Sequence, residues 1–179
     1  MKQGTICVQG AYRPKNGEPR VLPIVQSTTY KYDSSVEMGD LFDLKKSGYF
    51  YSRLQNPTND TVAAKITMLE GGVAGMLTSS GQAANFYAVF NIAQAGDHIV
   101  ASKTIYGGTY NLLEHTLPAY GITTTFVDAN NLDEIRNAIQ DNTKAVFIET
   151  LGNPNSNVVD IEEIAKIAHE NKIPLVFDN

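Results

Sequence analysis

The chain has 179 residues, of which 42% are hydrophobic and 18% charged, which is typical of a globular protein with a substantial core. Its formal net charge of −5, with no basic block, argues against nucleic-acid binding, which requires a positive field facing the phosphates. No apolar run is long enough to span a bilayer, and the single cysteine, Cys7, excludes an internal disulfide, so we expect a cytoplasmic protein without a membrane partner.

Residues 1–55 are predicted to form an irregular N-terminal arm. Glycine and proline recur there, and only residues 36–46 cluster their apolar side chains as a helix would. A long arm that cannot bury itself often lies on a neighbouring subunit, although a surface loop region would have the same composition. We therefore divide the chain into an arm, 1–55, and a domain portion, 56–179.

A helix is predicted to begin at Pro57, because Asn56 can cap it, and to end at Gly71. Tyr51 and Arg53 come just before it. Residues two apart in an extended segment point the same way, so the phenol and the guanidinium could clamp a phosphate together. An exposed arginine beside a half-buried tyrosine would give the same pattern without a ligand.

A predicted turn, Ser79-Ser80-Gly81-Gln82-Ala83-Ala84-Asn85, lies between a short apolar strand at 74–78 and a helix at 83–93. The N–H groups that begin a helix lack partners and face the positive end of its dipole, so they bind anions. Gly81 allows close approach to the main chain. We predict a phosphate site at this turn, while noting that small polar residues also suit an ordinary connection.

The rest of the chain alternates strands and helices. The predicted strands are 98–101, 122–127, 144–149 and 173–177, and the predicted helices are 108–117, 132–139 and a last one opened by a capping box of Asp160 and Glu163. This order predicts an α/β fold of three layers, with a mostly parallel, doubly wound sheet covered on both faces. Ligands of such sheets bind at the carboxyl ends of the strands.

Four polar residues follow predicted strands, at the edge where a ligand is expected: Tyr106, Glu149, Asn153 and Asp178. An aromatic ring, an amide, an acid and a phosphate site together suit a flat, phosphorylated heteroaromatic ring, whose protonated nitrogen would pair with the acid.

Other interpretations remain open for each residue. Tyr106 could be core packing, Asn153 is a normal turn residue before Pro154, and Asp178 could hold Mg²⁺ as in nucleotide hydrolases. The chain contains neither G-x-x-x-x-G-K-[ST] nor G-x-G-x-x-G, which disfavours a nucleotide site, and its three histidines lack metal-ligand spacing.

Taken together, these motifs resemble those of a known family. The matching segments are 51–58, 79–84, 106–109, 149–154 and 176–179. The chain is similar along its whole length to the Cys/Met-metabolism family of pyridoxal 5'-phosphate (PLP) dependent enzymes, which have fold type I. The resemblance implies PLP as cofactor and a homotetramer built from dimers that share active sites.

The resemblance also assigns roles around the cofactor phosphate. Gly81 and Gln82 would donate their backbone N–H groups to it. Tyr51 and Arg53 would reach the phosphate bound by a neighbouring subunit, which would explain the arm.

The remaining roles concern the cofactor ring. Tyr106 would stack on the ring and assist at the leaving group, and Asp178 would keep the ring nitrogen protonated; the resemblance makes these two the catalytic residues. Asn153 would lie near the phenolic oxygen of the ring. Glu149 matches an acid of the family.

Within the family, Gln82 and the stretch 40–46 are most similar to O-acetylhomoserine sulfhydrylases. The implied reaction replaces the acetate of O-acetyl-L-homoserine with sulfide or a thiol. A methionine γ-lyase or a cystathionine enzyme is the alternative, although methionine γ-lyases usually have a cysteine where this chain has Gly108.

The family's Schiff-base lysine and carboxylate-binding arginine lie beyond Asp178. We therefore expect residues 1–179 to be the N-terminal portion of a longer enzyme, inactive alone. An alternative of another class is a non-catalytic remnant that binds phosphate or assembles with related subunits.

Overall fold

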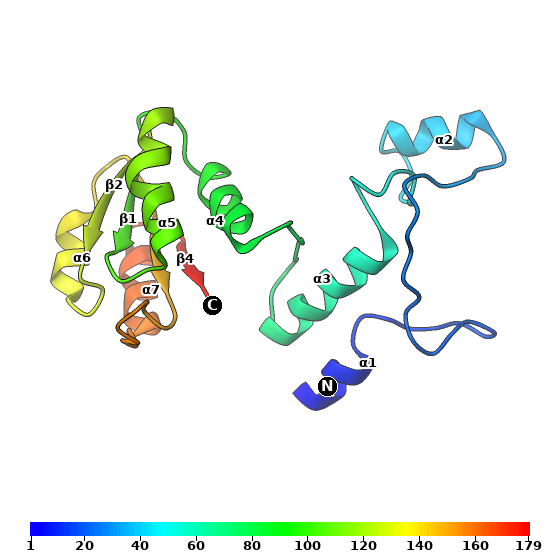
Figure 1. Ribbon diagram of the computed structural model, residues 1–179, viewed down its shortest axis with the longest axis horizontal. Coiled ribbons are helices and arrows are strands. Elements are labelled where there is room, and N and C mark those ends of the chain that lie inside the picture. The colour runs from blue at the N-terminus through cyan, green and yellow to red at the C-terminus, as the bar shows by residue number, and fades with distance from the viewer. The chain divides into compact units, whose positions relative to one another are not determined.

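The computed structural model describes residues 1–179, which divide into two compact units, Met1–Leu77 and Thr78–Asn179 (Figure 1). The predicted arm, residues 1–55, was defined by its expected contact with another subunit, so the boundary after residue 55 stays a prediction. Within the chain, the helix that follows Pro57 belongs to the first unit. No helix of the structure combines the length and apolarity needed to cross a membrane.

The first unit contains three helices, α1 (Gln3–Gln9), α2 (Ser35–Phe42) and α3 (Pro57–Glu70). The prediction for α3 is confirmed at both ends. The Asn56 side chain accepts a hydrogen bond from the Thr58 N–H, and Gly71 ends the helix with a φ of 65°.

Two predictions for this unit were wrong. Helix α2 is shorter than the predicted 36–46, because the chain leaves helical geometry at Asp43 and Leu44 has a φ of 57°. Helix α1 was not predicted at all. None of its residues is buried, so its sequence carries no apolar periodicity that would reveal it.

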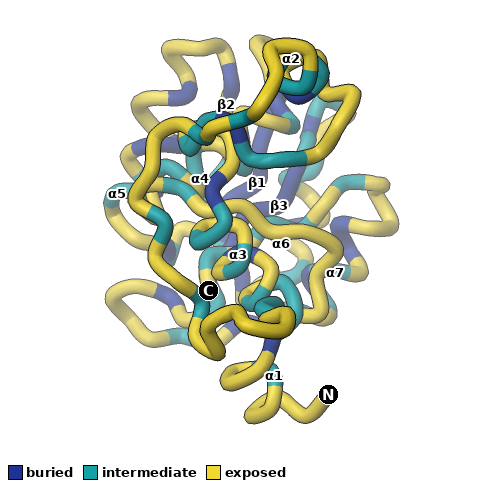
Figure 2. The backbone as a smooth tube through the Cα atoms, turned by 90° about the vertical axis from the view of Figure 1, so that its right-hand side faces the viewer, coloured by how far each residue is buried: buried dark blue, intermediate teal, exposed yellow.

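The second unit contains a parallel sheet of four strands in the order β2-β1-β3-β4. The strands are β1 (His98–Ser102), β2 (Thr123–Val127), β3 (Thr143–Glu149) and β4 (Leu175–Asp178). Its helices are α4 (Gly81–Phe90), α5 (Gly107–Asn111), α6 (Leu132–Ala138) and α7 (Ile161–Glu170). Strands β1 and β3 are the most deeply buried part of the unit (Figure 2).

Alternation along the strands divides the apolar side chains between two cores. Ile99 and Phe147 pack on one face of the sheet with residues of α4 and of the segment after α5. Val100 and Val146 pack on the other face with residues of α6 and α7. Helices therefore cover both faces of the sheet, which confirms the predicted three-layer α/β fold.

One predicted helix is irregular. The expected helix 108–117 is a short α5 followed by a π-helical turn, Leu112–Thr116, and a 3₁₀ turn, Leu117–Tyr120. Pro118 lies at the start of the 3₁₀ turn and Gly121 follows it with a φ of 79°, so the segment tightens and stops.

The predicted strand at 74–78 is not formed. Its residues form no ladder hydrogen bonds, and Met76 exposes its side chain. A strand requires a neighbour to satisfy its N–H and C=O groups, and residues 1–179 supply none for this segment.

The strand order defines where a ligand would bind. The chain leaves β1 toward α5 on one face of the sheet and leaves β3 toward α7 on the opposite face. Strands β1 and β3 are adjacent, so their carboxyl ends form a topological switch point, the usual ligand position in such sheets.

Candidate functional site

The first turn of α4 has the geometry of an anion site. Ser80 is extended, with φ −163° and ψ 159°, and its side chain accepts a hydrogen bond from the Ala83 N–H at 3.1 Å. The N–H groups of Gly81 and Gln82 have no acceptor within the protein. A Cβ atom built on Gly81 would meet nothing within 4 Å, so the approach to these amides is open.

Two carboxylates lie side by side at the carboxyl edge of the sheet. Glu149 ends β3 and Asp178 ends β4, and the two are paired in the ladder. Both lie on the sheet face that packs against α4, because their neighbours two residues earlier, Phe147 and Val176, contact that core.

Each carboxylate accepts a hydrogen bond from a different element. Asp178 Oδ2 accepts from Asn85 Nδ2 of α4 at 3.0 Å. Glu149 Oε2 accepts from the backbone N–H of Tyr106 at 2.6 Å. The second bond crosses the switch point, since Tyr106 follows β1 and Glu149 ends β3.

The contact between α4 and Asp178 relates the anion site to the acid. Asn85 lies four residues after Gly81, so the two are on the same face of α4, separated by a rise of about 6 Å along the helix. Asp178 is therefore held by a residue that lies about one helical turn after the free amides. This separation is compatible with one substituted ring that reaches both groups.

Tyr106 directly precedes α5, and its side chain is 53% exposed. The ring lies against Gly108, where a Cβ atom would be 2.5 Å from Tyr106 Cε1. The Gln82 side chain donates from Nε2 to the Gly108 carbonyl oxygen at 3.0 Å, which joins the start of α4 to this turn. The exposure does not fit the interpretation of Tyr106 as core packing.

Asn153 lies in an exposed turn after β3. Its N–H donates to the Thr104 carbonyl oxygen at 3.3 Å, so the turn is tied to the segment that leads to Tyr106. The Asn157 side chain, through Nδ2, donates to Thr104 Oγ1 at 3.2 Å and strengthens the same connection. The side chain of Asn153 itself makes no hydrogen bond, so its role stays a prediction.

Tyr51 and Arg53 belong to the first unit. The guanidinium carbon of Arg53 lies 5.3 Å from the centre of the Tyr51 ring, a cation–π contact. The expected extended segment is wrong, because residues 52–54 form a turn in which Leu54 and Gln55 donate to the Tyr51 carbonyl oxygen. Tyr51 is half-buried and Arg53 is exposed. This arrangement fits a phosphate clamp, and it also fits an exposed arginine beside a half-buried tyrosine that binds no ligand.

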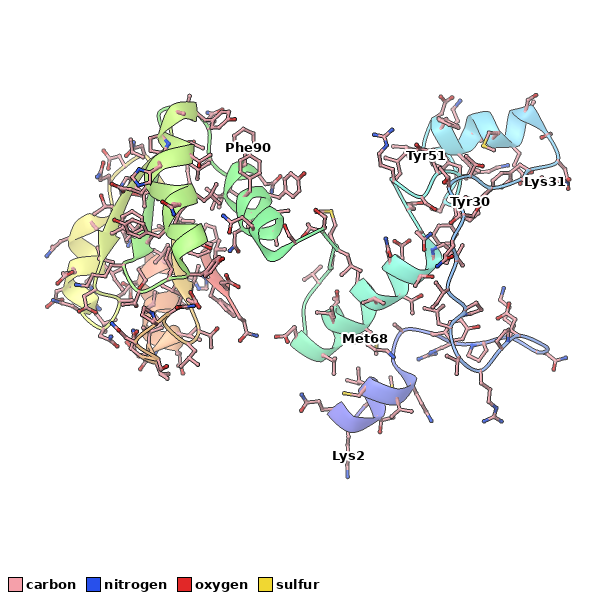
Figure 3. The ribbon with its side chains drawn as sticks, viewed as in Figure 1. Lys2, Tyr30, Lys31, Tyr51, Met68 and Phe90 are labelled. Carbon is pink, nitrogen blue, oxygen red and sulfur yellow. The ribbon has the colours of Figure 1, made fainter.

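A polar network holds this turn. Asn56 is 7% exposed, and its Nδ2 donates to the Val25 carbonyl oxygen and to Ser52 Oγ, both at 3.0 Å. Tyr30 Oη lies 3.2 Å from Ser52 Oγ, and Figure 3 shows Tyr30 close to Tyr51 between α2 and α3. Burial, followed by the charge of Asp60, raises the pKa of Tyr49, whose ring centre lies 5.9 Å from that of Tyr30.

Two further site residues, Asn85 and Thr109, were not predicted from the sequence; Thr109 Oγ1 accepts from Asn85 Nδ2 at 3.0 Å. Asn85 was part of the quoted turn motif but received no role. Its position four residues after Gly81 was the signal available in the sequence. Glu149 was predicted to lie at the ligand edge of the sheet and to match an acid of the family, and the structure gives it a defined partner in the Tyr106 N–H.

These features together define a class of protein. The fold is a parallel α/β sheet with open helix amides, an exposed aromatic ring and a carboxylate gathered near its switch point. These groups fit a phosphorylated pyridine. The amides can donate to the phosphate, and the carboxylate can accept from a protonated ring nitrogen. No Cβ atom blocks the approach at Gly81.

Comparison with known proteins identifies the family. The model of the family described as Cys/Met metabolism PLP-dependent enzyme matches residues 4–179, and this chain belongs to that family. The enzymes of the family depend on PLP and act on amino acids.

Several known proteins are similar to this chain. An O-acetyl-L-homoserine sulfhydrylase of Leptospira meyeri is 43% identical over 179 residues, covering 99% of this chain and 40% of the relative. An L-methionine gamma-lyase of Fusobacterium nucleatum is 44% identical over 156 residues, covering 87% of this chain and 40% of the relative.

A solved structure is similar over the whole chain. It is a putative O-acetylhomoserine (thiol)-lyase of Campylobacter jejuni that carries a pyridoxyl-lysine phosphate at position 205. Its TM-score is 0.94 and its identity 39%, over 100% of this chain and 44% of that protein. The chain thus spans less than half the length of these relatives, and their fold is that of fold type I PLP enzymes.

Proposed function

We propose that this chain is the cofactor-binding portion of an enzyme that replaces the acetate of O-acetyl-L-homoserine with sulfide, giving homocysteine and acetate in sulfur amino-acid biosynthesis. One observation carries the proposal. The open amides begin α4, and Asn85, about one helical turn further along the same helix, donates a hydrogen bond to the carboxylate of Asp178. The 43% identity with a sulfhydrylase supports the choice of reaction.

The residues of this chain would hold the cofactor at both ends. The N–H groups of Gly81 and Gln82 bind the phosphate, and the Asp178 carboxylate accepts a hydrogen bond from the protonated ring nitrogen. When bound, PLP supplies an electron sink for charge that develops on the substrate. A carboxylate that keeps the nitrogen protonated strengthens that property, so Asp178 acts on the reaction through the ring.

Tyr106 and Asn153 would act at the ring itself. The exposed ring of Tyr106 stacks on the pyridine, and its hydroxyl group can hold or give a proton near the leaving group. The hydrogen bond from its backbone N–H to Glu149 fixes the start of this segment. Asn153 donates its side-chain amide toward the phenolic oxygen.

The first unit would serve a neighbouring subunit. Tyr51 and Arg53 form a compact pair of a phenol and a cation, which suits a phosphate, and the Asn56 network holds the turn that carries them. In this proposal the arm reaches the phosphate site of another copy, and the protein is a homotetramer of dimers with shared sites.

An assay of products tests the reaction. With O-acetyl-L-homoserine and sulfide, the enzyme that contains this chain together with the family's lysine should release homocysteine and acetate, and residues 1–179 alone should bind PLP without turnover. Release of methanethiol and 2-oxobutanoate from L-methionine alone, without reaction of the acetyl ester, would contradict the proposal.

A methionine γ-lyase is the second candidate, since one relative has that name at 44% identity. Gly108 favours the sulfhydrylase, because the cysteine usual in γ-lyases would place its Cβ atom 2.5 Å from Tyr106 Cε1. The same product assay separates the two activities.

A further inference from the structure

Asn85 uses both hydrogens of its side-chain amide. Nδ2 donates to Asp178 Oδ2 and to Thr109 Oγ1, each at 3.0 Å. Asn85 is half-buried on α4, Thr109 is 1% exposed on α5, and Asp178 ends β4. One amide therefore joins two helices to the last strand beside the open amides of α4.

The orientation of this amide follows from its partners. If Oδ1 faced Asp178, an amide oxygen would lie against a carboxylate oxygen, and both would be acceptors. The carboxylate thus selects the orientation with Nδ2 toward it. The buried hydroxyl group of Thr109 then holds the other hydrogen and fixes the rotamer of Asn85.

The contact restricts how Asp178 can present its carboxylate. The last torsion of an aspartate is broad, so a carboxylate at a strand end turns freely unless it is held. The bond from Asn85 occupies Oδ2 and leaves Oδ1 to face a ligand.

Asn85 also leaves the charge of the acid intact. An amide is neutral, and Asp178 forms no ion pair with any lysine, arginine or histidine of the chain. A cation at position 85 would neutralise the carboxylate and weaken its attraction for a protonated ring nitrogen. A neutral donor orients the group without this cost.

We propose that Asn85 is a positioning residue that orients Asp178 toward the ring nitrogen of the cofactor and so makes the site selective for a protonated pyridine. The inference rests on the proposed function, in which Asp178 faces that nitrogen. It assigns to α4 two tasks, since its first turn offers the amides for the phosphate and Asn85, one turn later, orients the acid toward the far end of the ring.

Binding of two cofactor forms to the apoprotein tests this role. The probes are PLP and its 1-deaza analogue, in which a carbon replaces the ring nitrogen. The unchanged protein should bind PLP about tenfold to hundredfold more tightly than the analogue, the range of one charge-assisted hydrogen bond. Asn85→Leu and the smaller Asn85→Ala should reduce this ratio to within about threefold of one.

A matched control comes from the same helix. Asn91 ends α4, is exposed and makes no side-chain hydrogen bond, so Asn91→Leu and Asn91→Ala should keep the full ratio. A merely structural role of Asn85 would weaken both cofactor forms equally and leave the ratio unchanged, and that result overturns the inference while the proposed function stands. A ratio of one in the unchanged protein means that Asp178 does not face the nitrogen, and it overturns the proposed function as well.

Discussion

A Cβ atom on Gly108 would lie 2.5 Å from Cε1 of Tyr106 and 3.2 Å from Cδ1 and Cζ, so a side chain at 108 and the ring of Tyr106 cannot occupy their present places together. The ring of Tyr106 can occupy its present position only because residue 108 has no side chain.

Gly108→Ala should displace the Tyr106 ring and weaken PLP binding, because the ring can no longer lie where it would stack. We expect a loss of about tenfold in affinity, equivalent to about 1.4 kcal/mol. Cofactor titration of the apoprotein measures it. Gly107→Ala is the control, since a Cβ atom there meets nothing within 4 Å. Equal loss in both variants would contradict the role of Gly108.

Ser80→Ala should lower the free energy of unfolding by about 1 kcal/mol, because it removes the acceptor that caps the Ala83 N–H. Denaturant unfolding measures the change. Ser79→Ala removes a neighbouring exposed hydroxyl group that makes no hydrogen bond, so its effect should stay within about 0.5 kcal/mol. Similar losses in the two variants would show that capping is not the cause.

Asn56→Ala should destabilise the first unit by about 2–4 kcal/mol. It removes the cap of α3 and leaves the partly buried acceptors Val25 O and Ser52 Oγ without this donor. Asn56→Asp keeps the cap but not the donor, so it should fall between. Asn59→Ala, on the exposed side of α3, is the control for denaturant unfolding. A loss from Asn56→Ala no larger than that of the control would contradict the network.

Acid should destabilise the second unit through His98. His98 is only 2% exposed. Its Nδ1 lies 2.8 Å from Thr143 Oγ1, and its Nε2 lies 2.9 Å from Thr125 Oγ1. Burial lowers the pKa of His98 below its ordinary 6.5. The unfolded chain therefore binds a proton that the folded state resists, and stability falls as the pH drops from about 7 through the unfolded pKa toward the folded one.

Urea unfolding at pH 7.5 and at pH 5.5 measures this loss. His98→Gln should show a smaller fall in stability between the two pH values than the unchanged protein. His169→Gln, which changes an exposed ring, should keep the fall of the unchanged protein. An identical fall in the His98 and His169 variants would contradict the assignment.

Much of the fold follows from local sequence signals. The ends of α3 could be predicted because Asn56, Pro57 and Gly71 act within a few residues of each other. The central strands β1 and β3 could be predicted because strands that are buried on both faces are nearly continuous apolar runs. Strand β2 could be predicted from its alternation and its β-branched threonines. The start of α7 followed in the same way from Asp160, which accepts from the Glu163 N–H.

The failures concern features set by distant contacts. The apolar segment 74–78 resembles a strand, yet a strand forms only beside another strand, and periodicity within one segment does not report that partner. The position of Asn85 after Gly81 could have marked it as a candidate, but its hydrogen bond to Asp178, 93 residues later in the chain, could not be predicted. The pairing of Tyr106 with Glu149 likewise depends on the order of β1 and β3 in the sheet.

A crystal structure of the protein with PLP is the most direct test of the central claim, that one ring connects α4 with Asp178. The account predicts the phosphate within hydrogen-bond distance of the Gly81 and Gln82 N–H groups, and the ring nitrogen facing the Asp178 carboxylate, whose other oxygen stays on Asn85. A phosphate bound away from the start of α4, or a ring nitrogen directed away from Asp178, would contradict it.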